Sequence, residues 1–313
     1  MTVELIDIEK SFGENKVLNK VSFSAKGGGA FGLLGRNGAG KTTIIRIVMG
    51  VFPPDGGTVT VNGKRVSQSG ATFGYLPEER GLYPKHPIGD QLVYIGRLRG
   101  QTRADAEKSA RQWLERFSLT DTYPKKLSVL SKGNQQKVQL AAAIINDPDI
   151  VILDEPFSGF DPVNAQLLKD VVGELVGRGK VVFFSSHQMN YVEEFCEHIA
   201  IIGSGRIVLE GNLRQIKRGY DRSNVFTVLD CPGGAFLELN KSDARFSEIA
   251  QGVSEKNGGA IVRLRKPEYR DRLLALLLER NLPVERFEVL EPTLEEIFVE
   301  KVGDTPADGG KQK

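Results

Sequence analysis

The segment at residues 35–42, which reads GRNGAGKT, constrains the fold of this chain more than any other feature. A short apolar run at residues 30–34 precedes it, and an apolar-periodic stretch at residues 41–49 follows and ends at Gly50. A Gly-rich run between a strand and a helix is typical of a phosphate-binding loop. Glycines let backbone N–H groups turn inward around phosphate oxygens, and the helix N-terminus adds partial positive charge. A chance Gly-rich turn is the alternative, and the flanking strand and helix argue against it.

Two polar residues that open the helix have separate expected roles. Lys41 is predicted to reach the β- and γ-phosphates of a nucleotide, and the Thr42 hydroxyl is predicted to ligate Mg²⁺. The residues expected to bind the nucleotide in this loop are Gly35, Arg36, Asn37, Gly38, Ala39, Gly40, Lys41, Thr42 and Thr43.

A pair of acids follows a second apolar run. Residues 150–153 read IVIL, and Asp154 and Glu155 come directly after them. Sheets of α/β proteins bind ligands at the carboxyl ends of their strands. We expect Asp154 to hold Mg²⁺ through water and Glu155 to orient or deprotonate an attacking water. Two acids after an apolar run are more often a solvated strand end, but the phosphate loop in the same chain favours the catalytic interpretation.

One histidine has a comparable context. His187 follows an apolar strand at residues 181–184 and two serines, and is placed to hydrogen-bond a γ-phosphate. His86 and His198 lack such a context and are interpreted as ordinary structural or exposed residues. The residues predicted to act in catalysis are therefore Glu155, His187 and Lys41.

Composition excludes several classes of protein. The 42 basic and 40 acidic residues give a net charge of +2, which provides little attraction to nucleic acid. The longest apolar run, counting glycines, is nine residues, whereas a membrane-spanning helix needs about 20. The first residues, MTVELIDIEK, lack the basic start and apolar core of a signal peptide. Two cysteines cannot form a disulfide scaffold, so free thiols in a reducing cytosol are expected.

The pattern of the 313 residues indicates two domains. Residues 1–75 predict strands and turns, with a hairpin around Asn62-Gly63, and residues 88–146 predict helices. Strands alternate with a helix over residues 150–210, which favours a parallel sheet covered by helices. After about residue 220 the strands and helices predict a small α+β domain. In it Pro267 opens one helix, and Thr293 with Glu296 caps a last short helix that runs through Phe298.

A further motif connects these elements to a known family. The run LSKGNQQ at residues 130–136 resembles the signature motif of ATP-binding cassette (ABC) ATPases, and its serine lies 23 residues before Asp154. The phosphate loop, this signature, the acid pair, residues 158–161 and His187 occur in the order and near the spacing of that family. The resemblance covers about residues 1–220.

The resemblance implies the fold class: an α/β P-loop NTPase domain of the ABC type. Such a domain has a RecA-like parallel-sheet core, an antiparallel β subdomain and a helical subdomain, the last expected at about residues 85–150. We expect the nucleotide-binding domain at 1–220, the small α+β domain at 221–302 and a disordered tail at 303–313.

The resemblance also implies a site shared between two chains. In this family two nucleotide-binding domains dimerise head to tail, with ATP between the phosphate loop of one and the signature of the other. Ser131 and the Gly133 amide would contact the γ-phosphate across the interface, and Asp161 would report on the opposite site. Phe12 falls where the family stacks an aromatic ring on adenine, although an ordinary turn aromatic is the alternative. A complete site then needs a homodimer or a second nucleotide-binding subunit.

Three departures from the family pattern bear on the site. The signature has Lys132 and Asn134 where Gly and Gln are usual, while its serine and following glycine remain. Phe160 stands before Asp161 in place of a smaller residue. Glu78 occupies the position of a Gln that contacts Mg²⁺ and water. Glu78 can still ligate Mg²⁺, so the predicted metal ligands are Thr42, Glu78 and Asp154, but its charge adds repulsion near the acid pair.

Three segments resemble the ATPase subunits of type-2 ABC exporters of the sodium- and drug-efflux kind: residues 75–84, 130–133 and 291–298. This resemblance implies an ATPase that binds ATP and Mg²⁺ and drives separate membrane-spanning permease subunits through a groove near residues 78–84. It also implies a cytoplasmic location, peripheral at the inner face of the cell membrane, and no nucleic-acid partner. The C-terminal domain is expected to stabilise the dimer or dock a partner. The alternatives are a soluble ABC ATPase acting on ribosomes or DNA, and a nucleotide-binding regulator without turnover.

Overall fold

The computed structural model describes residues 1–79, 81–157, 162–220, 224–229, 243–256 and 259–303. The chain forms two compact units, one made of Met1–Leu213 with Phe298–Lys313 and the other of Arg214–Ile297. The chain thus leaves the first unit and returns to it near its end. Of the tail predicted at residues 303–313, Gly303 is described and residues 304–313 lie outside the described residues.

A six-stranded sheet forms the centre of the first unit, in the order β10-β9-β3-β8-β7-β6. The five strands from β9 to β6 run parallel, which confirms the predicted parallel sheet, and β10 adds an antiparallel edge strand. Every residue of β3, β7 and β8 is buried, as expected for strands covered on both faces. The strands are β3 (Ala30–Gly35), β6 (Phe73–Leu76), β7 (Ile150–Asp154), β8 (Val181–Ser186), β9 (His198–Gly203) and β10 (Arg206–Asn212).

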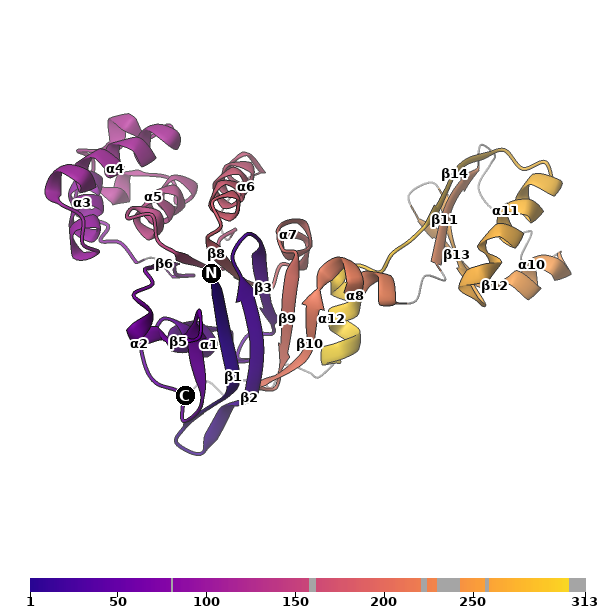
Figure 1. Ribbon diagram of the computed structural model, residues 1–313. Helices are drawn as coiled ribbons and strands as arrows, with labels where there is room; N and C mark the ends of the chain where they lie inside the picture. The colour runs from indigo at the N-terminus through magenta and orange to yellow at the C-terminus, as the bar shows by residue number, and fades with distance from the viewer. Residues whose placement is uncertain (80, 158–161, 221–223, 230–242, 257–258, 304–313) are drawn as a thin grey trace, which may run out of the picture. The chain divides into compact units, whose positions relative to one another are not determined.

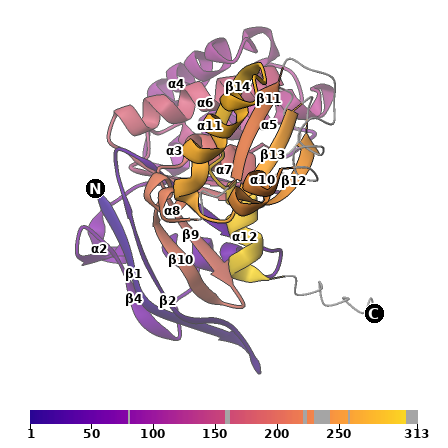
Figure 2. The same ribbon diagram turned by 90° about the vertical axis from the view of Figure 1, so that its right-hand side faces the viewer.

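A second, antiparallel sheet has the order β2-β1-β4-β5, and its long strands β1 and β2 lie side by side (Figure 2). The predicted hairpin joins β4 to β5 through Asn62 and Gly63, whose φ angles of 51° and 75° suit a tight turn between twisted strands. The elements are β1 (Thr2–Phe12), β2 (Asn15–Lys26), β4 (Gly56–Val61), β5 (Lys64–Arg65) and the short helix α2 (Val66–Ser69).

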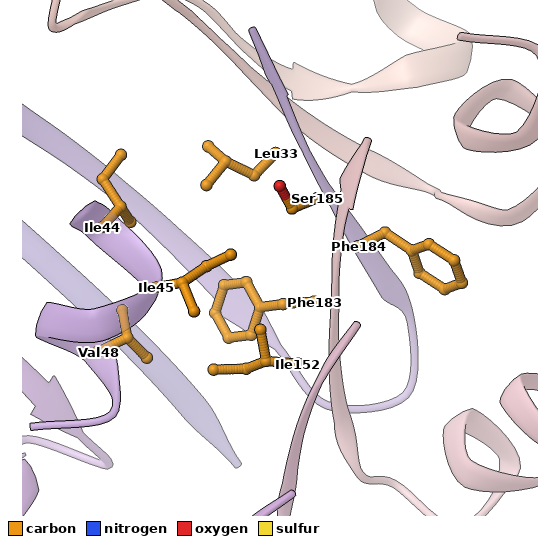
Figure 3. Close-up of a pocket in the computed structure, with 8 residues that line it drawn as sticks. All are labelled: Leu33, Ile44, Ile45, Val48, Ile152, Phe183, Phe184 and Ser185. Atoms are coloured by element: carbon orange, nitrogen blue, oxygen red, sulfur yellow. The ribbon is translucent and has the colours of Figure 1, made fainter. Parts of the chain in front are cut away.

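Helix α1 (Lys41–Val48) shares one hydrophobic core with both sheets. Figure 3 shows Ile44, Ile45 and Val48 of this helix facing the β-sheet side chains of Leu33, Ile152 and Phe183. Apolar residues recur along α1 at helical spacing, so one side of the helix is buried. This packing holds the start of α1 at the carboxyl end of β3.

Three helices form a group beside β6: α3 (Ile88–Leu98), α4 (Arg103–Arg116) and α5 (Lys132–Ile144) (Figure 1). They contact one another, and α5 also contacts β6. Their positions confirm the helical character predicted for residues 88–146, with short 3₁₀ turns at Thr120–Thr122 and Leu127–Val129. Helices α6 (Pro162–Gly177) and α7 (Met189–Phe195) follow β7 and β8, respectively.

The second unit is an antiparallel sheet in the order β12-β13-β11-β14 with two helices packed on it (Figure 1). Its core includes Val225 from the sheet, Phe246 from α10 and Leu273 from α11. A 3₁₀ turn at Pro267–Tyr269 begins the helix predicted there. The elements are β11 (Asn224–Leu229), α10 (Ala244–Ile249), β12 (Ala250–Lys256), β13 (Gly259–Leu264), α11 (Arg270–Glu279) and β14 (Val284–Val289), preceded by α8 (Leu213–Gly219).

The last helix, α12 (Leu294–Val302), begins with the predicted capping box. The Thr293 Oγ1 accepts from the Glu296 N–H at 3.2 Å, and the Glu296 carboxylate accepts from the Thr293 N–H at 2.8 Å. The helix continues four residues beyond the predicted end at Phe298. Across the described part of the chain, no helix combines the length and the apolar character needed to span a membrane.

Candidate active site

The loop between β3 and α1 has the backbone geometry of an anion cradle. Gly38 and Gly40 have φ angles of 80° and 108°, a region that side-chain-bearing residues rarely adopt. A Cβ atom at Gly40 would lie 2.6 Å from the Leu18 Cδ2, so a larger residue would also force the buried Leu18 side chain to shift. Gly40 caps α1 without a side-chain hydrogen bond, which leaves the first N–H groups of the helix available to a ligand.

Lys41 lies within this loop and is only 7% exposed. Its Nζ donates to the carbonyl of Gly35 at 2.6 Å and to that of Arg36 at 3.4 Å. Burial lowers the pKa of this ammonium, while the negative charges of Glu155, Asp154 and Glu78 act in the opposite direction. The ammonium therefore lies at the base of the cradle, beside three carboxylates.

The loop and the acid pair line one cleft of about 240 Å³. The three predicted metal ligands, Thr42, Glu78 and Asp154, all line it, and hard oxygen donors of this kind suit Mg²⁺. Among the described residues, no group of three or more acidic, His or Cys side chains is arranged to hold a metal by itself. This donor set fits an ion that takes its other ligands from nucleotide phosphates and water.

Asp154 ends β7 and is 3% exposed. Burial raises the pKa of its carboxyl, and the charges of Glu155 and Glu78 add to this, while the hydroxyl of Ser185 and the ammonium of Lys41 oppose it. The Tyr75 hydroxyl donates to the Asp154 Oδ2 at 3.4 Å.

Burial, together with the charge of Asp154, raises the pKa of Tyr75 to about 12. The Tyr75 phenol therefore keeps its proton, and can donate it to the Asp154 Oδ2, over the physiological range of pH. Tyr75 lies on β6, the strand adjacent to β7.

Glu155 is 4% exposed and has the left-handed φ angle of 48°, which is uncommon for a residue with a side chain. Its backbone N–H donates to the carbonyl of Ser185 at 2.8 Å, so the chain turns here while still attached to β8. The Oε1 atom accepts from the His187 N–H at 2.8 Å and lies 2.7 Å from the His187 Nδ1. The Oε2 atom accepts from the Ser186 hydroxyl at 2.9 Å. The end of β8 thus holds both oxygens of the carboxylate.

The side chain of His187 is half exposed, at 54%, and contacts Glu155 rather than lining the cleft. When Nδ1 donates to Glu155 in the neutral ring, Nε2 carries no proton and can only accept. The predicted bond from His187 to a γ-phosphate therefore requires either the protonated ring or release from Glu155. That contact stays a prediction.

The signature motif begins helix α5. Ser131 is the N-cap residue, and its Oγ accepts from the Asn134 N–H at 3.4 Å. Ser131 and Lys132 are exposed and Gly133 is half-buried, and among the described residues that line the cleft none comes from α5. Within one chain, the signature and the phosphate loop are therefore two separate surfaces.

Three other predicted site residues have different surroundings. Phe12 is 51% exposed at the end of β1, stacks edge-on with Phe52 at 5.8 Å between ring centroids, and does not line the cleft. The Arg36 guanidinium donates to the carbonyl of Gly303 at 2.7 Å, so its side chain is tied to the last described residue. Asp161, with its neighbours from residue 158, lies outside the described residues.

Two hydroxyls that contact the acid pair received no predicted role: those of Tyr75 and Ser186. Strand register could have predicted these contacts. Asp154 pairs with Ser185, the neighbour of Ser186, and Tyr75 pairs with Ile152, two residues before Asp154. Three neighbouring parallel strands that end in hydroxyls and acids place those groups at one edge.

A Gly-rich cradle, a buried lysine and an acid pair at the end of the neighbouring strand define a nucleotide-binding domain of the P-loop class. Residues 18–158 match the family described as ABC transporter, and residues 211–302 match the family described as ATP-binding protein DrrA1-3-like, C-terminal domain. The chain belongs to the ABC transporter ATP-binding proteins, whose members are ATPases that drive transport.

Named relatives support this assignment. The Uncharacterized ABC transporter ATP-binding protein YhaQ of Bacillus subtilis (strain 168) is 41% identical, over 95% of this chain and 97% of that protein. The Nod factor export ATP-binding protein I of Bradyrhizobium diazoefficiens is 32% identical, over 80% of this chain and 83% of that protein.

The fold also matches solved structures. An ATP-binding subunit of an ABC transporter superposes with a TM-score of 0.65 at 29% identity, over 70% of this chain and 92% of the other. The predicted fold class, an ABC-type P-loop domain, is confirmed.

Proposed function

We propose that this ABC ATP-binding subunit serves an exporter, in which two nucleotide-binding domains close head to tail around ATP and Mg²⁺ and drive separate membrane-spanning subunits. The observation that carries the proposal is the separation of two half-sites within one chain. Lys41, Asp154 and Glu155 meet in one cleft, whereas the exposed N-terminus of α5 lies outside it. A second chain that presents its own Ser131 and Gly133 would complete the cleft.

The residues of the cleft have different roles in hydrolysis. The N–H groups around Gly38 and Gly40 and the Lys41 ammonium bind and orient the phosphates. Thr42, Asp154 and Glu78 are the residues that would hold Mg²⁺, which neutralises charge on the phosphate oxygens when bound. Glu155 orients the attacking water and takes its proton, and His187 and Ser186 hold Glu155.

Export is the direction that the relatives favour. A relative that matches four fifths of this chain is named for Nod factor export, and the residues after 211 match a C-terminal domain family of ATP-binding proteins. We infer that the chain associates with the cytoplasmic face of the membrane through permease subunits, because it belongs to the ATP-binding proteins of ABC transporters.

A pull-down tests this association. Tagged Glu155→Gln chain with ATP, captured from gently solubilised native membranes, is expected to recover a polytopic membrane protein, identified by mass spectrometry. A membrane fraction without partners, together with recovery of ribosomes or DNA, would instead support a soluble ABC ATPase. The same capture with Lys41→Ala is the control, because this variant is expected to bind ATP weakly and not to lock the dimer.

The carboxylate of Glu78 gives a prediction of its own. Glu78 is exposed at the edge of the cleft, and its charge raises the pKa of the Asp154 carboxyl. Glu78→Gln keeps an oxygen ligand and removes repulsion toward phosphates, so basal turnover is expected to persist or to rise by up to about fivefold. Steady-state ATPase assays over a range of Mg²⁺ concentrations measure this. Complete loss of activity would mean that the carboxylate itself is required.

A further inference from the structure

We propose that Ser186 is a positioning residue for ATP hydrolysis: its hydroxyl fixes the Oε2 of Glu155 as the oxygen that receives the proton of the attacking water. The proposal rests on the role of Glu155 as the base. In that step the water oxygen bonds to the γ-phosphorus, the bond to the bridging β–γ oxygen breaks to release ADP, and one water proton moves to Glu155.

The two oxygens of Glu155 have unequal surroundings. The His187 N–H and Nδ1 both face Oε1, at 2.8 and 2.7 Å. The Ser186 hydroxyl donates to Oε2 at 2.9 Å. A carboxylate oxygen offers about two lone-pair positions. Among the contacts of the described residues, Oε1 is therefore filled and Oε2 keeps one position for the proton of a water.

The surroundings of Ser186 direct its hydroxyl proton toward Glu155. It is 1% exposed at the last position of β8. Its Oγ accepts from the Gln188 N–H at 3.1 Å, so the hydroxyl proton is left to point at Glu155. With a hydrogen bond on each oxygen, the carboxylate cannot rotate freely about its last bond. Loss of Ser186 would leave it held through Oε1 alone.

A simpler role for Ser186 would be to shape the turn between β8 and α7. The chain offers a control, because Ser69 makes the same turn bond at the end of α2 and does not line the cleft. Its Oγ accepts from the Ala71 N–H two residues later at 3.2 Å and donates to the Val66 carbonyl at 2.8 Å. Ser69 is half-buried rather than buried, so Ser69→Ala matches the loss of the turn bond, and it removes no contact with a catalytic group.

The experiment compares full-length Ser186→Ala, Ser186→Thr, Ser69→Ala and Glu155→Gln. Ser186→Ala is expected to lower kcat for ATP roughly 10- to 100-fold, as loss of a hydrogen bond to a charged group does. KM and the calorimetric ATP affinity are expected to stay within about twofold, because the phosphate cradle is untouched. Ser186→Thr keeps the hydroxyl and is expected to restore most of kcat, and Ser69→Ala is expected to leave kcat unchanged.

A double-variant cycle separates positioning from a general effect on the fold. In the Glu155→Gln background, Ser186→Ala is expected to cause little further loss in the single-turnover rate, since both act through one group. An unchanged kcat in Ser186→Ala, or an equal loss in both backgrounds, would overturn the proposal while leaving the role of Glu155 intact. Wild-type turnover in Glu155→Gln would overturn both.

Discussion

Replacing Glu155 by Gln is expected to lower kcat for ATP by at least about 100-fold while leaving ATP affinity nearly unchanged. Gln matches Glu in shape, and its carbonyl oxygen can accept the bond that the His187 N–H makes to Oε1 at 2.8 Å. The amide does not take up a proton near neutral pH, so the attacking water loses its base. Because Glu155 is 4% exposed, bulk water has little access to act as the base in place of its carboxylate.

An ATP-bound dimer is the second expected result of this substitution, because closure would no longer be followed by hydrolysis. Light scattering coupled to size-exclusion chromatography, with and without ATP, measures the dimer. Glu78→Gln is the matched control, since it removes a carboxylate from the same cleft and is expected to keep turnover. Wild-type hydrolysis by Glu155→Gln would remove Glu155 from its assigned role. Loss of turnover with no dimer would instead count against head-to-tail closure.

The parts of the site that sequence predicts well are those whose geometry is local. The loop from Gly35 to Thr42 carries its own backbone conformation in its glycines, so its bend follows from residue type. Asp154 and Glu155 follow an apolar strand, so their location at a sheet edge follows from chain order.

The contacts between distant segments were harder to foresee. The hydroxyls of Ser186 and Tyr75 reach the acid pair from 31 and 79 residues away, and their approach depends on the pairing of β6, β7 and β8. The contact of His187 with Glu155 also depends on the left-handed turn at Glu155, which a residue with a side chain does not signal in sequence.

The fold likewise has elements that could be predicted from local sequence and elements that could not. Burial on both faces gives parallel strands a continuous apolar run, so β3, β7 and β8 could be located from sequence. The edge strand β10 alternates half-buried with exposed residues and pairs antiparallel to β9, so nothing in its own residues assigns it to the parallel sheet. The sequence does mark the end of α12, because Gly303 directly follows Val302 with a left-handed φ of 70°, the usual conformation of a glycine that ends a helix. The predicted end at Phe298 is therefore wrong.

Lys41→Ala is expected to weaken ATP binding by about 2–5 kcal/mol, or roughly 30- to 5,000-fold in Kd. Lys41 is 7% exposed and its Nζ donates to the Gly35 carbonyl at 2.6 Å, so bulk water has little access to take its place. Arg36 also lines the cleft, but its guanidinium donates to the Gly303 carbonyl. Lys41→Met keeps most of the aliphatic stem and is expected to lose affinity to the same degree, which assigns the effect to charge. Isothermal calorimetry with ATP and Mg²⁺ measures both variants, and unchanged affinity would exclude the phosphate contact.

Lys41→Ala is also expected to make the free energy of unfolding more dependent on pH. Burial raises the pKa of the Asp154 carboxyl, and the Lys41 ammonium opposes that rise. A carboxyl with a raised pKa in the folded state binds protons more readily when folded, so the free energy of unfolding falls as pH rises through that interval. Without Lys41 the interval widens, so the drop in Tm relative to the wild type is expected to grow as the pH rises above the ordinary carboxyl pKa of about 3.9. Thermal melts without nucleotide over a series of pH values measure it, and a drop that does not change with pH would show that Lys41 does not compensate the acid pair.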